Sequence, residues 1–294
     1  MELFEDAAAF LDAAAGHLAL DPVLNTVVAS VAEREALEGR TTDPGLPHWY
    51  AVARADDGGV VGVAMRTAPF APYPLFVLPM PEDAAVELAR VLHARGEEVG
   101  GANGALPSVR TVVDETARRT GGEITVRMHT RLFELRRMRP TARPAGALRP
   151  ATEADLDVAL AWFQAFHAEA DEQAGRSAGH EGEAVSEEQV TRRLRAGRLF
   201  LWEVDGERVH LTGRNEPAYG AVRLGPVYTP REHRGRGYAR ATVAELSRRI
   251  LDDGDRPCLF TDQANPVSNG VYERIGYEPV VDMANLVITT PARA

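Results

Sequence analysis

The sequence predicts a mixed α/β protein built from two domains, and three observations lead to this expectation. Its 294 residues are nearly twice the ~150 residues of a common domain. In the C-terminal half, strand patterns alternate with helix patterns, as in a mixed sheet covered by helices. Between the halves, Pro140, Pro144 and Pro150 interrupt any helix. We therefore expect domains at 1–145 and 146–294.

Composition predicts an ordinary water-soluble protein. Hydrophobic residues make up 45% of the chain and charged residues 26%. No apolar run reaches the roughly 18 residues that a membrane helix needs. The first residues are acidic, whereas a secretory signal would begin with basic ones. We expect a cytoplasmic protein that does not bind membranes.

The ionisable residues exclude several kinds of function. A net charge of −10 argues against nucleic-acid binding, which depends on basic surfaces. All 33 basic residues are arginines, so no lysine is available for catalysis. The single cysteine, Cys258, cannot form an internal disulfide, and the eight histidines lack a spacing such as His-x-x-x-His. We expect no catalytic metal.

Apolar periodicity and turn residues predict the elements of both halves. In the N-terminal half, the predicted helices are 81–95 and 108–119, and the predicted strands are 49–54, 59–66 and 124–135. In the C-terminal half, the predicted strands are 147–149, 198–204, 208–214, 221–228, 258–261 and 278–288. The helices there start at 153 and cover 186–196, 237–252 and 266–275. A glycine-rich stretch at 173–183 indicates a loop that could border a substrate site.

A turn rich in glycine and arginine links a predicted strand to the amphipathic helix at 237–252. Free backbone N–H groups at a helix N-terminus bind anions, and glycine lets them approach a diphosphate closely. Arg231, Arg234, Arg236 and Arg240 lie in or beside this turn, so coenzyme A would find side-chain partners as well. The alternative is a simple turn that starts a surface helix.

The pattern Arg234-x-x-Gly237-x-Ala239 after a strand resembles the acetyl-coenzyme A signature of the GNAT superfamily of N-acetyltransferases. The segment from Asn265 to Tyr277 resembles a second signature of that superfamily, an asparagine followed by a short helix that bears a tyrosine and ends in Gly-aromatic. The resemblance covers residues 148–287. It implies the acyl-coenzyme A N-acyltransferase (GNAT) fold, in which two parallel strands splay apart around the thioester.

The resemblance also implies a cofactor, acetyl-coenzyme A, and a set of site residues. Strand backbone would hold the pantetheine arm and the turn would hold the diphosphate. The implied cofactor residues are Val227, Tyr228, Thr229, Arg234, Gly235, Arg236, Gly237, Tyr238, Ala239, Arg240, Asn265 and Asn269. Tyr272 is the expected general acid, although a tyrosine there could instead pack in the core. Asn265 could fix the ligand, cap its helix, or do both.

The implied reaction transfers an acetyl group to an amine of a small molecule or a peptide by direct attack on the thioester. A backbone N–H near Tyr228 or Thr229 would stabilise the developing oxyanion. The base is left open, and the candidates by position alone are Glu203, His210, Glu216 and Asp262. His233 is expected to support the loop, and the acid-rich run 169–188 either attracts a cationic acceptor or is simply solvated.

The N-terminal half shows no such signature. Its best position for a cofactor loop, Val77 to Asp83, holds prolines and acids instead of glycines. We expect a degenerate GNAT-like domain that shapes the acceptor cleft or the surface of a homodimer. Two alternatives to an enzyme stay open: a non-catalytic acetyl-coenzyme A sensor, and a scaffold whose loop binds no cofactor. The sequence does not identify the acceptor.

Overall fold

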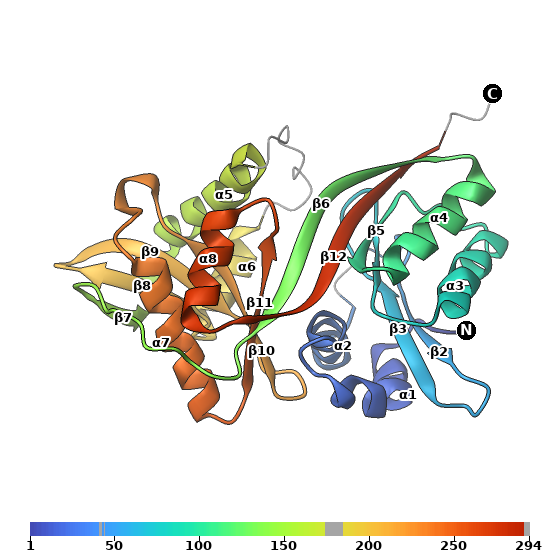
Figure 1. Cartoon of the computed structure of the whole chain (residues 1–294), viewed down its shortest axis with the longest axis horizontal. Coiled ribbons are helices and arrows are strands. Elements are labelled where there is room, and N and C mark those ends of the chain that lie inside the picture. The colour runs from blue at the N-terminus through green and yellow to red at the C-terminus, as the bar shows by residue number, and fades with distance from the viewer. Residues whose placement is uncertain (41–42, 44, 174–184, 291–294) are drawn as a thin grey trace. The chain divides into compact units, whose positions relative to one another are not determined.

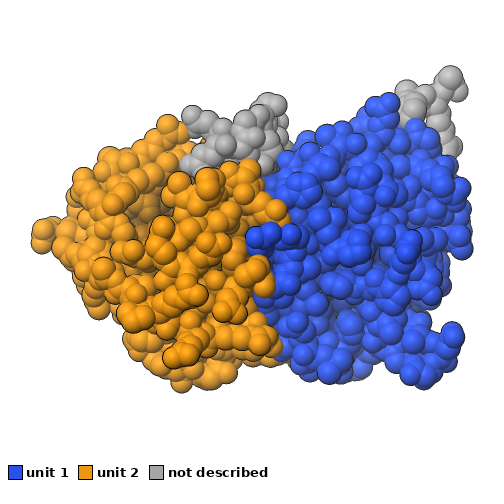
Figure 2. All heavy atoms as spheres, viewed as in Figure 1, with its two compact units in different colours: residues 1–132, 280–294 blue, residues 133–279 orange. Residues whose placement is uncertain are grey.

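The computed structural model of the chain describes residues 1–40, 43, 45–173 and 185–290. The chain folds into two compact units, which are coloured separately in Figure 2: unit 1 is Met1–Leu132 with Val280–Ala294, and unit 2 is Phe133–Pro279. The units differ from the predicted domains, because residues 133–145 belong to unit 2 and most of the last strand belongs to unit 1. Of the predicted loop at 173–183, residues 174–183 lie outside the described residues.

Unit 1 is a mixed sheet with four helices among its described residues. Its elements are β1 (Glu2–Phe4), α1 (Ala7–Leu20), α2 (Thr26–Glu38), β2 (Trp49–Arg54), β3 (Val60–Arg66), β4 (Leu75–Val77), α3 (Glu82–Ala94), β5 (Gly101–Ala105), α4 (Ser108–Thr120), β6 (Glu123–Glu134) and β12 (Glu278–Thr289). The strands follow the order β1-β2-β3-β4-β5-β12-β6. β4 and β5 are parallel, and the other registered pairs of described residues in this unit are antiparallel.

Unit 2 repeats this arrangement. Its elements are β7 (Ala147–Pro150), the 3-10 helix η1 (Glu153–Asp155), α5 (Leu156–Gln173), α6 (Glu187–Arg195), β8 (Leu199–Val204), β9 (Glu207–Arg214), β10 (Ala221–Tyr228), the 3-10 helix η2 (Arg231–His233), α7 (Tyr238–Asp252), β11 (Arg256–Asp262) and α8 (Pro266–Ile275). The strands follow the order β7-β8-β9-β10-β11, and β6 lies next to β11 (Figure 1). The predicted order of elements after residue 146 is therefore confirmed.

Two long strands carry the chain from one unit to the other. β6 begins in unit 1, and where it reaches unit 2 the N–H of Leu135 donates to the carbonyl of Pro257 at 2.9 Å. β12 follows α8 of unit 2, yet its later residues pair with β5, with Leu286 opposite Ala102. The strand that completes the sheet of unit 1 is thus supplied by the end of the chain.

Turn and cap residues explain why the elements of unit 2 begin and end where they do. Asp205 and Gly206 both have positive φ, at 49° and 84°, which is the geometry of a two-residue hairpin between β8 and β9. Ser186 caps α6 and accepts from Gln189 N–H at 3.2 Å. Gly254, with φ of 86°, follows α7 in the left-handed conformation that stops a helix.

Each unit has an apolar core beneath its helices. In unit 2, Val243, Leu246 and Ile250 form the buried stripe of α7 and pack against Val222 and Leu259 on the sheet. This stripe has the helical spacing that the sequence predicts. In unit 1, α3 and α4 pack on the sheet through a cluster of their own. No helix of the described residues is both long enough and apolar enough to cross a membrane.

Candidate functional site

The central feature of unit 2 is a gap between two parallel strands. β10 and β11 are paired from Ala221 opposite Arg256 to Arg223 opposite Cys258. Beyond this point β10 continues to Tyr228 and β11 to Asp262, but their registered pairing has ended. β10 also changes register against β9 between Leu224 and Val227. The second half of β10 therefore has backbone groups on its β11 side that no registered pair occupies.

The loop after β10 opens onto this gap as an uncapped helix N-terminus. Gly235 and Gly237 have φ of 75° and 85°, a region that side chains other than glycine rarely adopt. Gly237 occupies the N-cap position of α7 and provides no side-chain cap, and the first turn carries no acid. The N–H of Ala241 bonds to the carbonyl of Gly237 at 3.0 Å, so the N–H groups before it have no partner within the helix.

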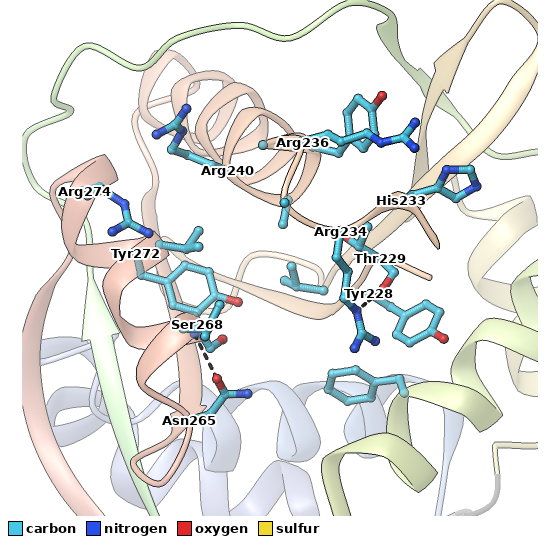
Figure 3. A pocket seen from close by; sticks show the side chains of 18 of the residues that line it. Tyr228, Thr229, His233, Arg234, Arg236, Arg240, Asn265, Ser268, Tyr272 and Arg274 are labelled. Atoms are coloured by element: carbon cyan, nitrogen blue, oxygen red, sulfur yellow. Dashed lines mark hydrogen bonds between the residues drawn. The ribbon is translucent and has the colours of Figure 1, made fainter. Parts of the chain in front are cut away.

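The gap and the loop line one cavity of about 660 Å³. Figure 3 shows arginines on several sides of it, with Arg240 and Arg274 on the opposite side from Tyr228. The Nε of Arg240 is buried without a hydrogen-bond partner among the described residues. Unpaired N–H groups and several guanidinium groups together suit a ligand with several phosphates. Arg274 was not predicted from the sequence, although it lies two residues after Tyr272 in the second signature.

Tyr272 reaches this cavity from α8. Its side chain lines the cavity although the residue is only 5% exposed, and its ring packs edge-on against Tyr277 with 6.0 Å between centroids. Burial raises the pKa of the Tyr272 phenol, so its hydroxyl keeps a proton throughout the neutral range. Tyr272 therefore both packs in the core and lies at the cavity, as the two interpretations from the sequence predict.

The two predicted asparagines have different positions. Asn265 lines the cavity and caps α8, since its Oδ1 accepts from Ser268 N–H at 3.0 Å (Figure 3). Asn269 is not among the lining residues. Its Nδ2 donates to the carbonyls of Asp262 and Gln263 at 3.3 and 3.4 Å, which joins α8 to the end of β11. Asn269 thus holds the helix in place, and the structure puts it outside the cavity that the other predicted cofactor residues line.

Glu169, a residue of α5 in the acid-rich run, also lines the cavity. The hydroxyl of Tyr228 donates to its Oε1 at 2.8 Å, and Arg234 forms a close ion pair with Oε2. Partial burial opposes ionisation of Glu169, but the bonds from Arg234 and Tyr228 outweigh it and lower the pKa of the carboxyl group. Burial, together with the bond to Glu169, raises the pKa of Tyr228 to about 12. Arg234 also donates through Nε to the carbonyl of Thr229 at 2.9 Å.

None of the four candidate bases lines the cavity among the described residues. His210 is fully buried, with its ring nitrogens 2.7 Å from Thr229 Oγ1 and 2.6 Å from Thr212 Oγ1. Burial lowers the pKa of His210 to about 3, so it cannot hold a proton near pH 7. Glu203 and Glu216 form ion pairs with Arg149 and Arg198, and Asp262 accepts from Ala264 N–H at 2.9 Å.

The family model described as FR47-like protein matches residues 205–285, which include the gap and the loop. No curated protein sequence matches the chain. A tandem GNAT protein from the clavulanic acid biosynthesis pathway has a similar structure, with 14% identity, coverage of 100% of both chains and a TM-score of 0.53.

Two further solved structures are similar over most of the chain. A Drosophila protein from a structural genomics consortium covers 98% of both chains at 15% identity, with a TM-score of 0.63. A GCN5-related N-acetyltransferase from Sphaerobacter thermophilus covers 89% of this chain and 87% of its own at 17% identity, with a TM-score of 0.55. The chain has the tandem GNAT fold. The sequence-based resemblance to the GNAT superfamily and the predicted fold class are confirmed.

In unit 1, the strands that correspond to β10 and β11 do not splay. β4 and β5 stay paired from Leu75 opposite Ala102 to Val77 opposite Gly104. Val77 is the last residue of β4, so the pairing continues to the end of that strand. The approach is so close that a Cβ added to Gly104 would lie 2.0 Å from the carbonyl oxygen of Val77. The gap present in unit 2 is therefore closed at this point in unit 1.

The loop after β4 also lacks free N–H groups. Pro79 and Pro81 have none, the N–H of Leu78 donates to Val63 at 3.2 Å, and the N–H of Met80 donates to Ser108 Oγ at 3.0 Å. The first turn of α3 carries Glu82 and Asp83, which repel anions from the helix N-terminus.

No group of three histidine, cysteine or acidic side chains in the described part of the chain could hold a metal ion.

Proposed function

We propose that unit 2 binds acetyl-coenzyme A and transfers its acetyl group to an amine of a small molecule or a peptide. The observation that carries this proposal is the single cavity that joins two features: the backbone of β10 where its pairing with β11 has ended, and the uncapped N-terminus of α7. The first feature suits an extended amide-containing arm, and the second suits a diphosphate. The GNAT fold supports the same chemistry.

Each group of lining residues has a role in this proposal. The backbone of Val227, Tyr228 and Thr229 would bind the pantetheine arm, and one of its N–H groups would stabilise the oxyanion. The segment 234–240 would bind the diphosphate through backbone N–H groups and through Arg236 and Arg240. Asn265 would contact the ligand while it caps α8.

The proposed reaction is a single displacement. The acceptor nitrogen forms a bond to the thioester carbon, the carbon–sulfur bond breaks, and the sulfur leaves as a thiolate. The nitrogen releases one proton to solvent, and the thiolate takes the proton of the general acid, which solvent then reprotonates. Tyr272 is the proposed general acid, because its hydroxyl lines the cavity and is kept protonated by burial. No residue of the chain forms a covalent intermediate in this scheme. The amine must arrive uncharged to attack, because an ammonium has no lone pair.

Two measurements on the full chain test the proposal. Titration calorimetry with acetyl-coenzyme A should give saturable binding, and a screen of small amines, amino acids and peptide N-termini should release free thiol when an acceptor is found. Binding without release of thiol from any acceptor would instead support the non-catalytic sensor. The absence of binding would remove both, and would leave the scaffold. A cytoplasmic location and a homodimer remain predictions from the sequence.

A further inference from the structure

The cavity of unit 2 has one carboxylate among the described residues of its lining, and several arginines. Among the described residues, Glu169 is the only acidic side chain in the lining, whereas Arg234, Arg236, Arg240 and Arg274 all contribute guanidinium groups. Through its bonds to Tyr228 and Arg234, Glu169 is held at the end of β10. Figure 3 shows its partner Tyr228 on the opposite side of the cavity from Arg240 and Arg274. The proposed diphosphate site does not explain a carboxylate at this place, since it would repel phosphate.

Aromatic residues share the face of α5 that carries this carboxylate. Trp162, Phe166 and Glu169 follow one another at spacings of four and three residues on α5, which puts them on one face of the helix. Phe166 lines the cavity, and the ring of Trp162 lies 6.1 Å from the ring of Tyr228. A carboxylate bordered by aromatic rings is a favourable environment for an alkylammonium group, because both attract a cation.

The partners of Glu169 keep it ionised without holding it permanently. Arg234 and Arg231, which lies 3.5 Å from Oε2, have side chains that are 38% and 60% exposed. Glu169 itself is only 16% exposed, but both arginine side chains reach solvent, so water can solvate either guanidinium group when it leaves the carboxylate. A positively charged ligand can therefore take the place of Arg234 and keep the carboxylate paired.

We propose that Glu169 selects the acceptor by binding a second, positively charged group of it, such as the distal ammonium of an alkyldiamine. This inference rests on the proposed function, since it assumes that an acceptor enters this cavity. The carboxylate holds the charged end in place of Arg234 and leaves the other amine free to react. Glu169 is a positioning residue in this scheme and takes no part in proton transfer.

A binding experiment without turnover tests the proposal. The full chain is titrated by calorimetry with 1,4-diaminobutane and with n-butylamine, both with and without coenzyme A, which carries no acetyl group. The wild-type chain should bind the diamine at least about tenfold more tightly than the monoamine, as expected for one additional charge-assisted hydrogen bond. Glu169→Gln keeps the shape of the side chain and removes its charge, so this preference should disappear.

Two further variants separate a local effect from a general one. Glu153→Gln removes a carboxylate that pairs with Arg195 at 2.9 Å on the surface and does not line the cavity, so the preference for the diamine should be kept. Glu169→Asp keeps the charge and should retain part of the preference. Equal binding of the two amines by the wild-type chain, or an unchanged preference in Glu169→Gln, would overturn the proposal.

The outcome is independent of the test of the proposed function. A preference that depends on Glu169, in a chain that never releases thiol from acetyl-coenzyme A, would support the cation site and contradict the acetyltransferase. Thiol release by a chain without this preference would support the acetyltransferase and contradict the role of Glu169. In an active chain, Glu169→Gln should raise KM for diamine acceptors and change kcat much less, because the reacting groups are untouched.

Discussion

At the scale of single residues, Tyr272 shows how one side chain can serve packing and chemistry. Its ring belongs to the core of unit 2 with Ile275 and Tyr277, while its hydroxyl borders the cavity. The packing fixes where the hydroxyl lies, and the same burial raises the pKa of the phenol. The proposed general acid must be both positioned and protonated, and packing in the core would provide both properties.

Tyr272→Phe should lower kcat by about a hundredfold or more, the usual contribution of a general acid, with little change in the affinity for acetyl-coenzyme A. Because the folded-state pKa is raised, Tyr272 stays protonated up to its ordinary pKa of about 10 and causes no loss of rate below it. Steady-state kinetics and calorimetry measure both quantities. Tyr277→Phe is the control, since that hydroxyl bonds to Ser247 at 2.7 Å and does not line the cavity. Equal rates for wild type and Tyr272→Phe would remove Tyr272 from the mechanism.

His210 is a second residue whose role the structure decides. It is enclosed between Thr229 and Thr212, and it supports the end of β10 by bonding to Thr229. Its lowered pKa of about 3 makes it a poor base, so its position near the site reflects support of the strand. Sequence position alone could not distinguish these roles.

The buried imidazole of His210 should make the protein less stable in mild acid. The unfolded chain takes up a proton at His210 below its ordinary pKa of about 6.5, whereas the folded chain does so only near 3. The stability is therefore fully present above pH ~6.5 and falls by about 1.4 kcal/mol per pH unit below it. Urea unfolding of wild type and His210→Gln between pH 7 and 5 should show this slope in the difference between them. Parallel pH profiles would contradict it.

At the scale of elements, the N-terminus of α7 combines several local features with one effect. Glycines with positive φ shape the turn, no side chain caps the helix, and no acid lies in its first turn. Natural helices usually satisfy these N–H groups with a Ser, Thr, Asp or Asn cap, as Ser186 does for α6. An uncapped N-terminus that lines a cavity supports the proposal that acetyl-coenzyme A supplies the missing acceptors.

Gly237→Ala should weaken acetyl-coenzyme A binding by about tenfold, because a Cβ at a φ of 85° costs about 1 to 2 kcal/mol and shifts the N–H groups of the turn. Gly254→Ala provides a matched control at the other end of α7. Gly254 has a φ of 86° and open space around its Cα, so this variant should lose similar stability and keep its affinity for the ligand. Thermal unfolding and calorimetry compare the two. An equal loss of affinity in both variants would mean that the effect is only one of stability.

At the scale of the whole molecule, the two units have the same strand order but differ where the ligand would bind. Unit 2 has splayed strands and a loop of glycines, and unit 1 has paired strands and a loop of prolines. The difference is local, because each unit keeps its own packed core. Under the proposed function, this local difference would make unit 2 the unit that binds the cofactor.

The chain should therefore bind one molecule of acetyl-coenzyme A. In unit 1, β4 and β5 stay paired up to Val77 and Gly104, prolines occupy the loop after β4, and two acids lie in the first turn of α3. Titration calorimetry with a protein of known active concentration should give a stoichiometry of one per chain, and Gly237→Ala should weaken that single site. A second molar equivalent with comparable affinity would show that unit 1 also binds the cofactor.

The sequence by itself determined the fold class, the order of elements in the second half and the loop at 234–240. These depend on short-range patterns: the apolar stripe of Val243, Leu246 and Ile250, the Asp205-Gly206 turn, and the glycines before α7. Eleven of the twelve predicted cofactor residues, all except Asn269, line one cavity together with Tyr272. Local spacing specifies such features because it acts through the backbone conformation of neighbouring residues.

Only the tertiary structure showed the features that depend on long-range contacts, namely the ion pair of Glu169 and the partner of the last strand. Glu169 and Arg234 are separated by 65 positions in sequence, and no local pattern could show that they meet. The last strand looked like the end of the second domain, yet its later residues pair with β5 of unit 1. The sequence of a strand predicts which of its faces is buried, but it does not predict which strand lies beside it. The neighbour is decided by the packing of the whole sheet.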